Sequence, residues 1–210
     1  MGNHREIEIR GLNLIIYDHD LEPFTGTDLL GCSVWDCAII LAHYLPNYAR
    51  SHPFASNTVL ELGAGTGLPG LVAAALGAPR VTLTDRTHLL PGLRRNVEAN
   101  AHIFSSDVRV AALEWGREDQ VAAVDGQPFD LVLMSDLLYN VSSVKDLCRT
   151  LKAVTDRRSE ILLSYELREG TTECFRVLRE EGFGWEKVGK EELDPVWQSD
   201  DIGIFKVYYL

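Results

Sequence analysis

The stretch from residue 58 to residue 67 reads Thr58-Val59-Leu60-Glu61-Leu62-Gly63-Ala64-Gly65-Thr66-Gly67. Its first half is apolar apart from one acid, which predicts a short buried strand. The three glycines that follow predict a tight turn where the backbone can approach a ligand closely. The apolar run from Leu68 to Leu76, with Gly77 behind it, predicts a helix whose first amides face that turn. The stretch therefore predicts a strand, a glycine-rich ligand-binding turn and a helix.

The glycines of this turn can be assigned in two registers. Gly65 to Gly70 spells the dinucleotide fingerprint G-x-G-x-x-G, but it begins two residues after Gly63, the first glycine behind the strand. The other register, acid-x-G-x-G-x-G, begins at Glu61. A carboxylate there suits a ligand with an ammonium or hydroxyl group rather than a pyrophosphate, and this register resembles the S-adenosylmethionine loop of class I methyltransferases. A glycine-rich turn without a ligand is the third alternative.

Apolar strands alternate with helices through the rest of the chain. The predicted strands cover 58–62, 80–84, 108–113, 129–134, 161–165, 185–188 and 202–208, and the predicted helices cover 34–45, 68–76, 89–101, 141–154 and 172–181. Pro46 is expected to stop the first helix. This alternation predicts an α/β fold with a parallel sheet covered by helices on both faces. The last two strands have no helix between them, so we expect them to be antiparallel to each other.

The length of 210 residues predicts a single domain. Residues 5–18 alternate around Gly11 and predict an N-terminal β-hairpin, residues 19–31 a loop, and residues 34–210 the core. The longest nearly apolar run is too short for a membrane helix, which needs about 20 residues. The first residues are polar and charged rather than apolar, so no signal peptide is expected.

Charge and cysteine content narrow the partners and the compartment. Lys and Arg number 20 against 31 Asp and Glu, a net charge of −11 that repels a polyphosphate. We therefore expect basic protein surfaces rather than nucleic acid as partners, unless the charge serves only solubility. The cysteines lack C-x-x-C or zinc-type spacing, so free thiols in a reducing compartment and no metal site are expected. They are Cys32, Cys37, Cys148 and Cys174.

Acidic and aromatic residues follow the ends of the next three strands. Asp85 stands 24 residues after Glu61, where an acid can bind a ribose diol, or it caps the following helix. Trp115 follows the third strand and can stack on adenine, or it packs in the core. Asp136 and Tyr139 follow the fourth strand, beside the reactive end of a bound cofactor, or Asp136 caps the next helix. In a doubly wound sheet, ligands bind beyond the carboxyl ends of the strands, where the strand order reverses.

Together these motifs resemble family 16 of the seven-strand methyltransferases, the protein-lysine methyltransferases marked by Asp-x-x-Tyr. The resemblance runs from about Gly31 to the C-terminus. It rests on Val34-Trp35-Asp36, residues 61–67, Asp85, residues 113–116, residues 136–139, Tyr165-Glu166-Leu167-Arg168 and residues 197–202. Within the family, the chain looks most similar to the enzymes that methylate the valosin-containing AAA ATPase, with Hsp70 and elongation-factor 1A methyltransferases as near relatives. Cys37 departs from the alanine that is common after Trp-Asp or Trp-Glu, and the N-terminal hairpin and its loop look short.

The resemblance implies a Rossmann-like sheet of seven strands in the order 3-2-1-4-5-7-6, with the last strand antiparallel. It also implies S-adenosyl-L-methionine as the cofactor and no metal. The residues it assigns to the cofactor are Trp35, Glu61, Gly63, Ala64, Gly65, Gly67, Asp85, Trp115 and Ser135. It makes Asp136 and Tyr139 catalytic and places Tyr165 and Glu166 along the substrate channel.

The implied activity is methylation of a lysine side chain in a protein substrate: an AAA ATPase, a chaperone or an elongation factor. We expect a monomer in the cytoplasm or the nucleus, without nucleic acid or membrane partners. The alternatives are a methyltransferase with a small-molecule or other non-lysine acceptor, a silent cofactor-binding scaffold and an NAD-dependent oxidoreductase. Asp136-Leu137-Leu138-Tyr139 differs from the Asn/Asp-Pro-Pro-Tyr motif that indicates base or glutamine acceptors.

Overall fold

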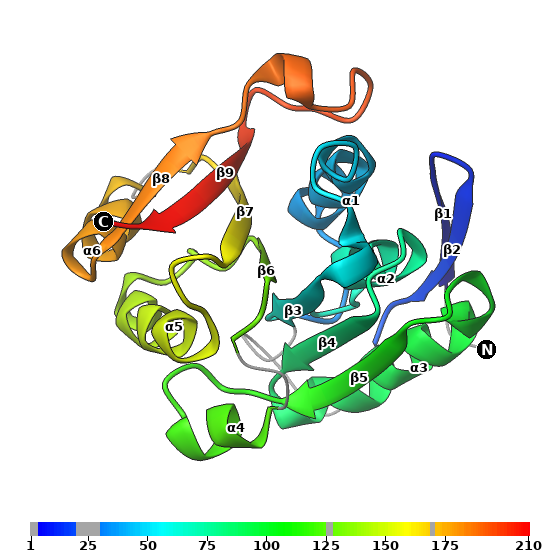
Figure 1. Ribbon diagram of the computed structural model, residues 1–210, viewed down its shortest axis with the longest axis horizontal. Helices are drawn as coiled ribbons and strands as arrows, with labels where there is room; N and C mark the ends of the chain where they lie inside the picture. The colour runs from blue at the N-terminus through cyan, green and yellow to red at the C-terminus, as the bar shows by residue number, and fades with distance from the viewer. Residues whose placement is uncertain (1–3, 20–29, 125–127, 169–170) are drawn as a thin grey trace.

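The computed structural model describes residues 4–19, 30–124, 128–168 and 171–210, which form a seven-stranded sheet and a separate two-stranded sheet (Figure 1). From one edge, the seven strands are β5 (Asp107–Ala112), β4 (Arg80–Asp85), β3 (Thr58–Leu62), β6 (Leu131–Ser135), β7 (Glu160–Glu166), β9 (Ile202–Tyr209) and β8 (Phe183–Lys187). Neighbouring strands are parallel except at β9, which is antiparallel to both β7 and β8. Numbered within this sheet, the order is 3-2-1-4-5-7-6, so the expected topology is confirmed.

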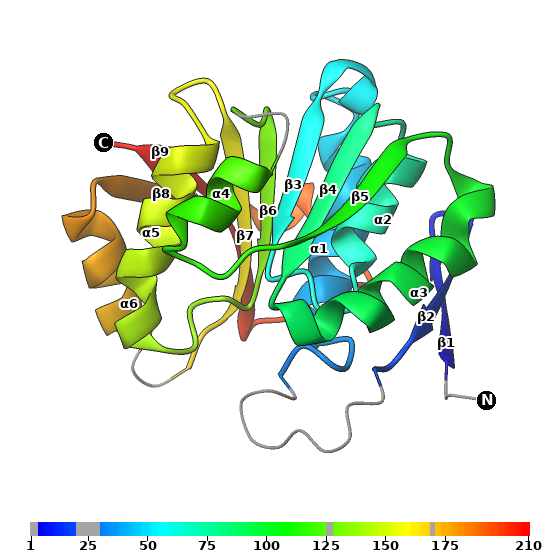
Figure 2. The ribbon, with the colours of Figure 1, turned by 90° about the horizontal axis from the view of Figure 1, so that it is seen from below.

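Helices cover both faces of the sheet (Figure 2). One face carries α1 (Asp36–Tyr48), α2 (Leu68–Ala75) and α3 (Leu90–Asn100), and the other carries α4 (Glu118–Ala123), α5 (Val141–Val154) and α6 (Thr171–Glu180). Val59 of β3 packs in the first core and its neighbour Leu60 in the second. Because both faces are buried, the central strands are apolar at successive positions. Within the described residues, no helix is both long and apolar enough to cross a membrane.

Two features of the helices differ from the prediction. Pro46 does not stop the first helix, because α1 continues to Tyr48 with the proline in its last turn. Tyr48 is buried, and the Ala49 N–H still donates to the Leu45 carbonyl at 2.9 Å, so packing and the remaining hydrogen bonds outweigh the donor that proline lacks. The short α4 has no predicted counterpart, because Val121 is its single buried residue and gives no periodic pattern.

The N-terminal hairpin, β1 (His4–Ile9) and β2 (Leu12–Tyr17), forms the two-stranded sheet and confirms the expected hairpin. Two asparagines of α3 hold it. Asn100 bonds the N–H and the carbonyl of Ile15 at 2.9 and 2.7 Å, and Asn96 bonds those of Tyr17 at 2.8 and 3.1 Å. The Asn96 amide also donates to the Thr66 carbonyl at 3.0 Å, which ties the hairpin to the glycine-rich turn. Most of the loop expected over 19–31 lies outside the described residues.

Candidate active site

The glycine-rich turn after β3 has the conformation that its sequence predicts. Gly63, Gly65 and Gly67 have φ angles of 56°, 53° and 84°, in the left-handed region where other residues are strained. A Cβ atom on Gly63 would lie 2.6 Å from the Leu137 side chain, and one on Gly67 would lie 2.7 Å from Leu93. The turn therefore requires glycine both for its backbone angles and for space.

Glu61, near the end of β3, is buried and contacts the first turn of α2. Its Oε2 accepts a hydrogen bond from the Gly70 backbone N–H at 2.9 Å. Burial raises the pKa of Glu61 to about 8; the Gly70 hydrogen bond opposes this shift and the Asp85 carboxylate adds to it. A cationic group bound nearby would favour the ionised carboxylate. This environment fits the ligand ammonium group that the acid-first register predicts.

Asp85, the last residue of β4, organises the same turn. Its Oδ2 accepts from the Gly65 N–H and its Oδ1 from the Arg86 N–H, both at 2.7 Å. Burial raises the pKa of Asp85, and these two amides oppose the shift. The next α-helix begins only at Leu90 and has no side-chain cap, so the helix-capping alternative for Asp85 is wrong. Because a carboxylate offers about four lone-pair sites, both oxygens can still accept from a ribose diol.

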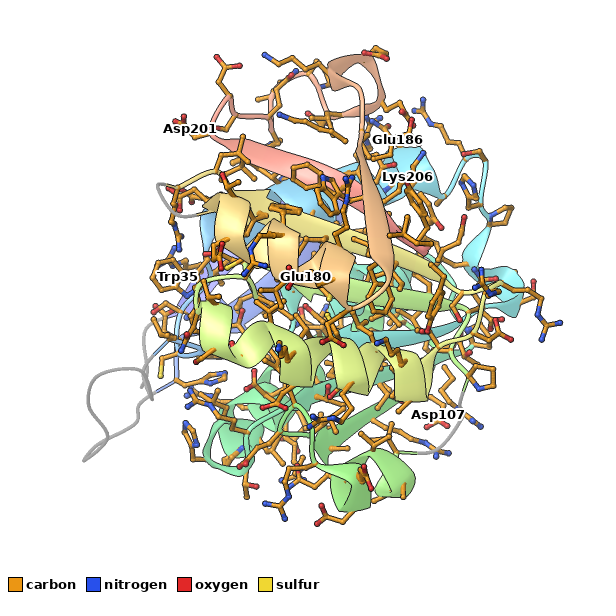
Figure 3. The ribbon with its side chains drawn as sticks, turned by 90° about the vertical axis from the view of Figure 1, so that its left-hand side faces the viewer. Trp35, Asp107, Glu180, Glu186, Asp201 and Lys206 are labelled. Carbon is orange, nitrogen blue, oxygen red and sulfur yellow. The ribbon has the colours of Figure 1, made fainter. Side chains whose placement is uncertain are left out.

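A cavity of about 370 Å³ lies at the carboxyl ends of the central strands, within the size range of small-molecule sites. Ten predicted site residues line it: Trp35, Glu61, Gly63, Ala64, Gly65, Asp85, Trp115, Ser135, Asp136 and Tyr139. Trp115 packs on the second core and also lines the cavity, so the core role is shown and adenine stacking stays a prediction. Trp35 and Asp107, the first residue of β5, lie on opposite sides of the molecule (Figure 3). The cavity is therefore at the edge of the sheet where ligands are expected.

Asp136 directly follows β6 and adopts an uncommon backbone conformation, with a φ of 54°. Its N–H donates to the Ser164 carbonyl at 2.9 Å, and its Oδ2 accepts from Arg168 Nη2 at 2.8 Å. Oδ1 is buried and has no hydrogen-bond partner within the described part of the chain. The cap of α5 is Asn140, whose side chain accepts from the Ser142 N–H at 3.0 Å. The helix-capping alternative for Asp136 is therefore wrong.

Two aromatic side chains border the opening of the cavity. Tyr139 is 48% exposed and Trp35 is 46% exposed, and both line the cavity wall. Burial of its ring raises the pKa of Tyr139, so the phenol is neutral near pH 7. The Trp35 Nε1–H donates to the Leu30 carbonyl at 2.6 Å, which fixes the plane of the indole.

Three predicted residues do not line the cavity. Gly67 stands one residue before α2 and shapes the turn from behind. Tyr165 is buried in the second core, where its ring packs edge-on against Phe175 at a centroid distance of 5.7 Å. The structure therefore does not place Tyr165 along a substrate channel. Glu166 is also absent from the wall, but it holds Arg168, which does line the cavity.

Arg168 is the most informative lining residue without a predicted role. It lies two residues beyond β7, in the segment Tyr165-Glu166-Leu167-Arg168 that contributes to the family resemblance. Other lining residues without a predicted role include Leu30, Gly31, Ser33, Arg86, Ser143 and Asp146. The four cysteines are buried and form no disulfide within the described ranges, which also hold no group of acidic, histidine or cysteine side chains suited to a metal ion.

Comparison with known proteins decides between the alternatives for this cavity. A family model described as lysine methyltransferase matches residues 20–180. The chain belongs to the lysine methyltransferase family. Protein N-lysine methyltransferase METTL21A of Mus musculus is 38% identical over 175 residues, which cover 82% of this chain and 75% of that protein. EEF1A lysine methyltransferase 3 of Xenopus tropicalis is 32% identical over 197 residues, 88% of this chain and 82% of that protein.

Solved structures share the fold of this methyltransferase. A chain crystallised with SAH and described as a methyltransferase superposes with a TM-score of 0.64 at 17% identity, covering 98% of this chain and 56% of its own. Ribosomal protein L11 methylase from Lactobacillus delbrueckii gives a TM-score of 0.55 at 19% identity, covering 80% and 77% of the two chains. At these identities the likeness shows the fold alone.

The methyltransferase is an S-adenosylmethionine-dependent protein-lysine N-methyltransferase. Its cavity fits the cofactor. The left-handed Gly63 and Gly65 form part of its wall, and the buried acids Glu61 and Asp85 suit an ammonium group and a ribose diol. When bound, S-adenosylmethionine supplies the methyl group from its sulfonium. The residues that would hold it are those on the cavity wall contributed by the ends of β3, β4 and β5.

Proposed function

We propose that the methyltransferase modifies a lysine exposed on the surface of a protein, and that Asp136 receives the incoming amine. The observation that supports this most is the buried Oδ1 of Asp136, a carboxylate oxygen on the cavity residue that directly follows β6. Such an oxygen is a hydrogen-bond acceptor without a donor among the described residues, and a neutral lysine amine supplies N–H donors. The half-exposed rings of Tyr139 and Trp35 leave the entrance accessible from outside.

The chain's residues then have a simple task. The nucleophile must be the neutral amine, whose free pKa is about 10.4, and entry into a desolvated channel lowers that pKa. Asp136 accepts an amine hydrogen and aims the nitrogen lone pair, while the proton itself can leave to water. Tyr139 forms an aromatic wall that favours a methylated ammonium by about 0.5–2 kcal/mol. Position and alignment are therefore the main contributions of the protein.

For the substrate, we propose elongation factor 1A, an Hsp70 chaperone or the valosin-containing AAA ATPase. One relative named above is an EEF1A lysine methyltransferase, and the other two substrates follow from the family resemblance of residues 61–67 and 136–139. The net charge of −11 favours a basic protein surface over nucleic acid. We further propose that the enzyme acts as a monomer in the cytoplasm.

The test is radiolabelling. The enzyme is incubated with tritiated S-adenosylmethionine and each of the three purified proteins, and then with cell extract, and labelled residues are located by mass spectrometry. We expect label on the ε-amine of a single lysine, and Asp136→Ala enzyme as the control should give none. Label on an α-amine or on small molecules alone would contradict the proposal. No transfer to any of the three proteins, with a labelled lysine in the extract, would redirect only the substrate assignment.

A further inference from the structure

We propose that Arg168 is a positioning residue for methyl transfer: it fixes one oxygen of Asp136, and its charge favours the neutral form of a substrate amine at the other. The inference rests on the proposed function, because it concerns the amine that Asp136 receives. It gives a role to a cavity residue that the cofactor site does not use.

The Arg168 guanidinium bridges two carboxylates. Its Nη2 donates to Asp136 Oδ2 at 2.8 Å, its Nε donates to Glu166 Oε2 at 2.8 Å, and Nη2 also contacts Glu166 Oε2. A guanidinium is a rigid planar fork, so two anchors fix its plane and hold the Asp136 carboxylate against it. A lysine could supply the same charge but not these two donor directions.

Three features restrain Asp136 and leave one of its carboxylate oxygens available as an acceptor. Its N–H is bonded to the Ser164 carbonyl, its backbone is left-handed, and its Oδ2 is taken by Arg168. Oδ1 is the remaining acceptor, buried and without a partner among the residues that the structure describes. A buried polar atom in this state is unfavourable, so an incoming amine N–H gains most by bonding to Oδ1.

The positive charge of Arg168 acts on the same amine. An amine bonded to Oδ1 would lie about 4–6 Å from the guanidinium, the range in which a like charge disfavours the ammonium form. Among the described residues, titratable groups beside Asp136 or Arg168 include the Cys37 thiol of α1, Tyr139 and Glu166. Burial, and then the Asp136 charge, raise the pKa of Cys37, and burial raises the pKa of Tyr139, so both are neutral near pH 7. Water screens both Glu166, which is 42% exposed, and Arg168, which is 38% exposed, but Arg168 contacts the Asp136 carboxylate directly at 2.8 Å.

The sign of the effect follows. A nearby cation lowers the pKa of the bound amine, so the neutral nucleophile is present at lower pH than without Arg168. Removing the cation should raise the pH of half-maximal transfer. It should also allow a permanently charged ammonium form to bind Asp136 more tightly, because the guanidinium no longer competes for the carboxylate.

A binding experiment tests this without any protein substrate. n-Butylammonium chloride, a mimic of the lysine side chain, is titrated at pH 7 into enzyme saturated with S-adenosylhomocysteine. We expect Arg168→Gln to bind it at least about tenfold more tightly than wild type, the equivalent of one pKa unit. The matched control is Arg158→Gln, which removes an 88% exposed arginine paired with Asp156 near the opposite end of β7 and should change nothing. Equal affinity of Arg168→Gln and wild type would overturn the charge argument.

A kinetic experiment tests the clamp, using the protein that the radiolabelling identifies. For Arg168→Gln we expect the pH–rate midpoint to rise by about one unit and transfer at pH 7 to fall at least tenfold. Arg168→Lys should keep the midpoint but lose rate at every pH, because it retains charge without the fork. A uniform loss in Arg168→Gln would indicate a merely structural role. If Arg168→Gln does not fold, an unchanged rate in Arg168→Lys refutes the clamp. If wild type transfers nothing, the proposed function fails, while the n-butylammonium titration still tests the charge of Arg168.

Discussion

The loops that follow β3 and β6 leave adjacent parallel strands at the same edge of the sheet, and both begin with a left-handed residue. After β3 that residue is Gly63, with a φ of 56°, and after β6 it is Asp136, with a φ of 54°. In the first loop the nearby acids are satisfied by backbone amides. In the second, a non-glycine residue carries the backbone strain and a buried oxygen lacks a partner among the described residues. The acids beside the loop after β3 thus have their hydrogen bonds before binding, and the loop after β6 retains strain and unsatisfied polarity where we propose that the amine binds.

The largest effect should come from Asp136→Asn, which preserves shape and one acceptor oxygen but removes the charge. We expect kcat to fall by at least about 100-fold, because a charge in a desolvated pocket stabilises the transition state more than a neutral dipole does. Cofactor affinity, measured by calorimetry, should be nearly unchanged, since Glu61 and Asp85 are intact. Near-wild-type turnover would remove the functional contrast between the two loops.

Gly63→Ala should introduce backbone strain into the loop after β3. The new Cβ would meet Leu137 at 2.6 Å in a backbone conformation that alanine rarely adopts. Backbone strain and overpacking together should lower the free energy of unfolding by about 3 kcal/mol and weaken cofactor binding. Chemical denaturation measures the first effect and calorimetry the second. Gly77→Ala is a matched control, because Gly77 has a φ of 98° but no atom within 4 Å of its Cβ position. Equal losses in both variants would show that space around Gly63 contributes nothing.

Glu61→Gln should show how burial of an acid acts on the cofactor side. The folded pKa of Glu61 is about 8 and the reference value is 4.5, so the folded state holds an extra proton between these values and wild-type stability declines as pH rises. Glutamine removes this term. Relative to wild type, the variant should therefore gain roughly 1.4 kcal/mol per pH unit between pH 6 and 7. Cofactor-free enzyme is unfolded in urea at both pH values, and a constant difference would refute the raised pKa.

The smallest effect should come from Asn140→Ala. The variant removes the side-chain cap of α5 and should cost about 1 kcal/mol of stability without changing kcat. Asn140→Asp, which retains a capping oxygen, should recover the loss. Thermal unfolding and steady-state kinetics together separate capping, which belongs to Asn140, from the role of Asp136. A fall in kcat for Asn140→Ala at temperatures where the variant is folded would contradict this separation of the two roles.

Residue type explains which parts of the site could be predicted from the sequence. Glycines encode left-handed turns by themselves, so the loop after β3 and the two acids near it were predictable. The alternating apolar segments predicted the parallel sheet, and the strand order followed from the family resemblance. The backbone strain at Asp136 could not be predicted, because most aspartates have a negative φ. The ion pair of Arg168 with Asp136 could not be predicted, because the two residues are 32 positions apart in the chain.

Tyr165 was predictable in principle and was assigned to the wrong place. Side chains in β7 alternate between faces, and Leu163 and Tyr165 both lie in the core under α5 and α6. Ser164 points the other way and donates to the Cys37 carbonyl of α1 at 2.9 Å. Applying the two-residue period to this strand would have separated Tyr165 from Glu166.

The pairing of the hairpin with α3 sets a rule for building chimeras. Asn96 and Asn100 are four helical residues apart, a rise of about 6.0 Å, and they meet Ile15 and Tyr17, two strand residues apart, a rise of about 6.6 Å. The spacing of the two side-chain amides thus matches the spacing of the strand residues, and each amide bonds a backbone N–H and carbonyl as a neighbouring strand would. A truncated protein that begins at residue 34 would lack the strand that covers this face of α3. Its Asn96 amide would keep the hydrogen bond to the Thr66 carbonyl but lose the one to the Tyr17 carbonyl. A hairpin from another family member is portable only with a helix that carries amides at the same spacing.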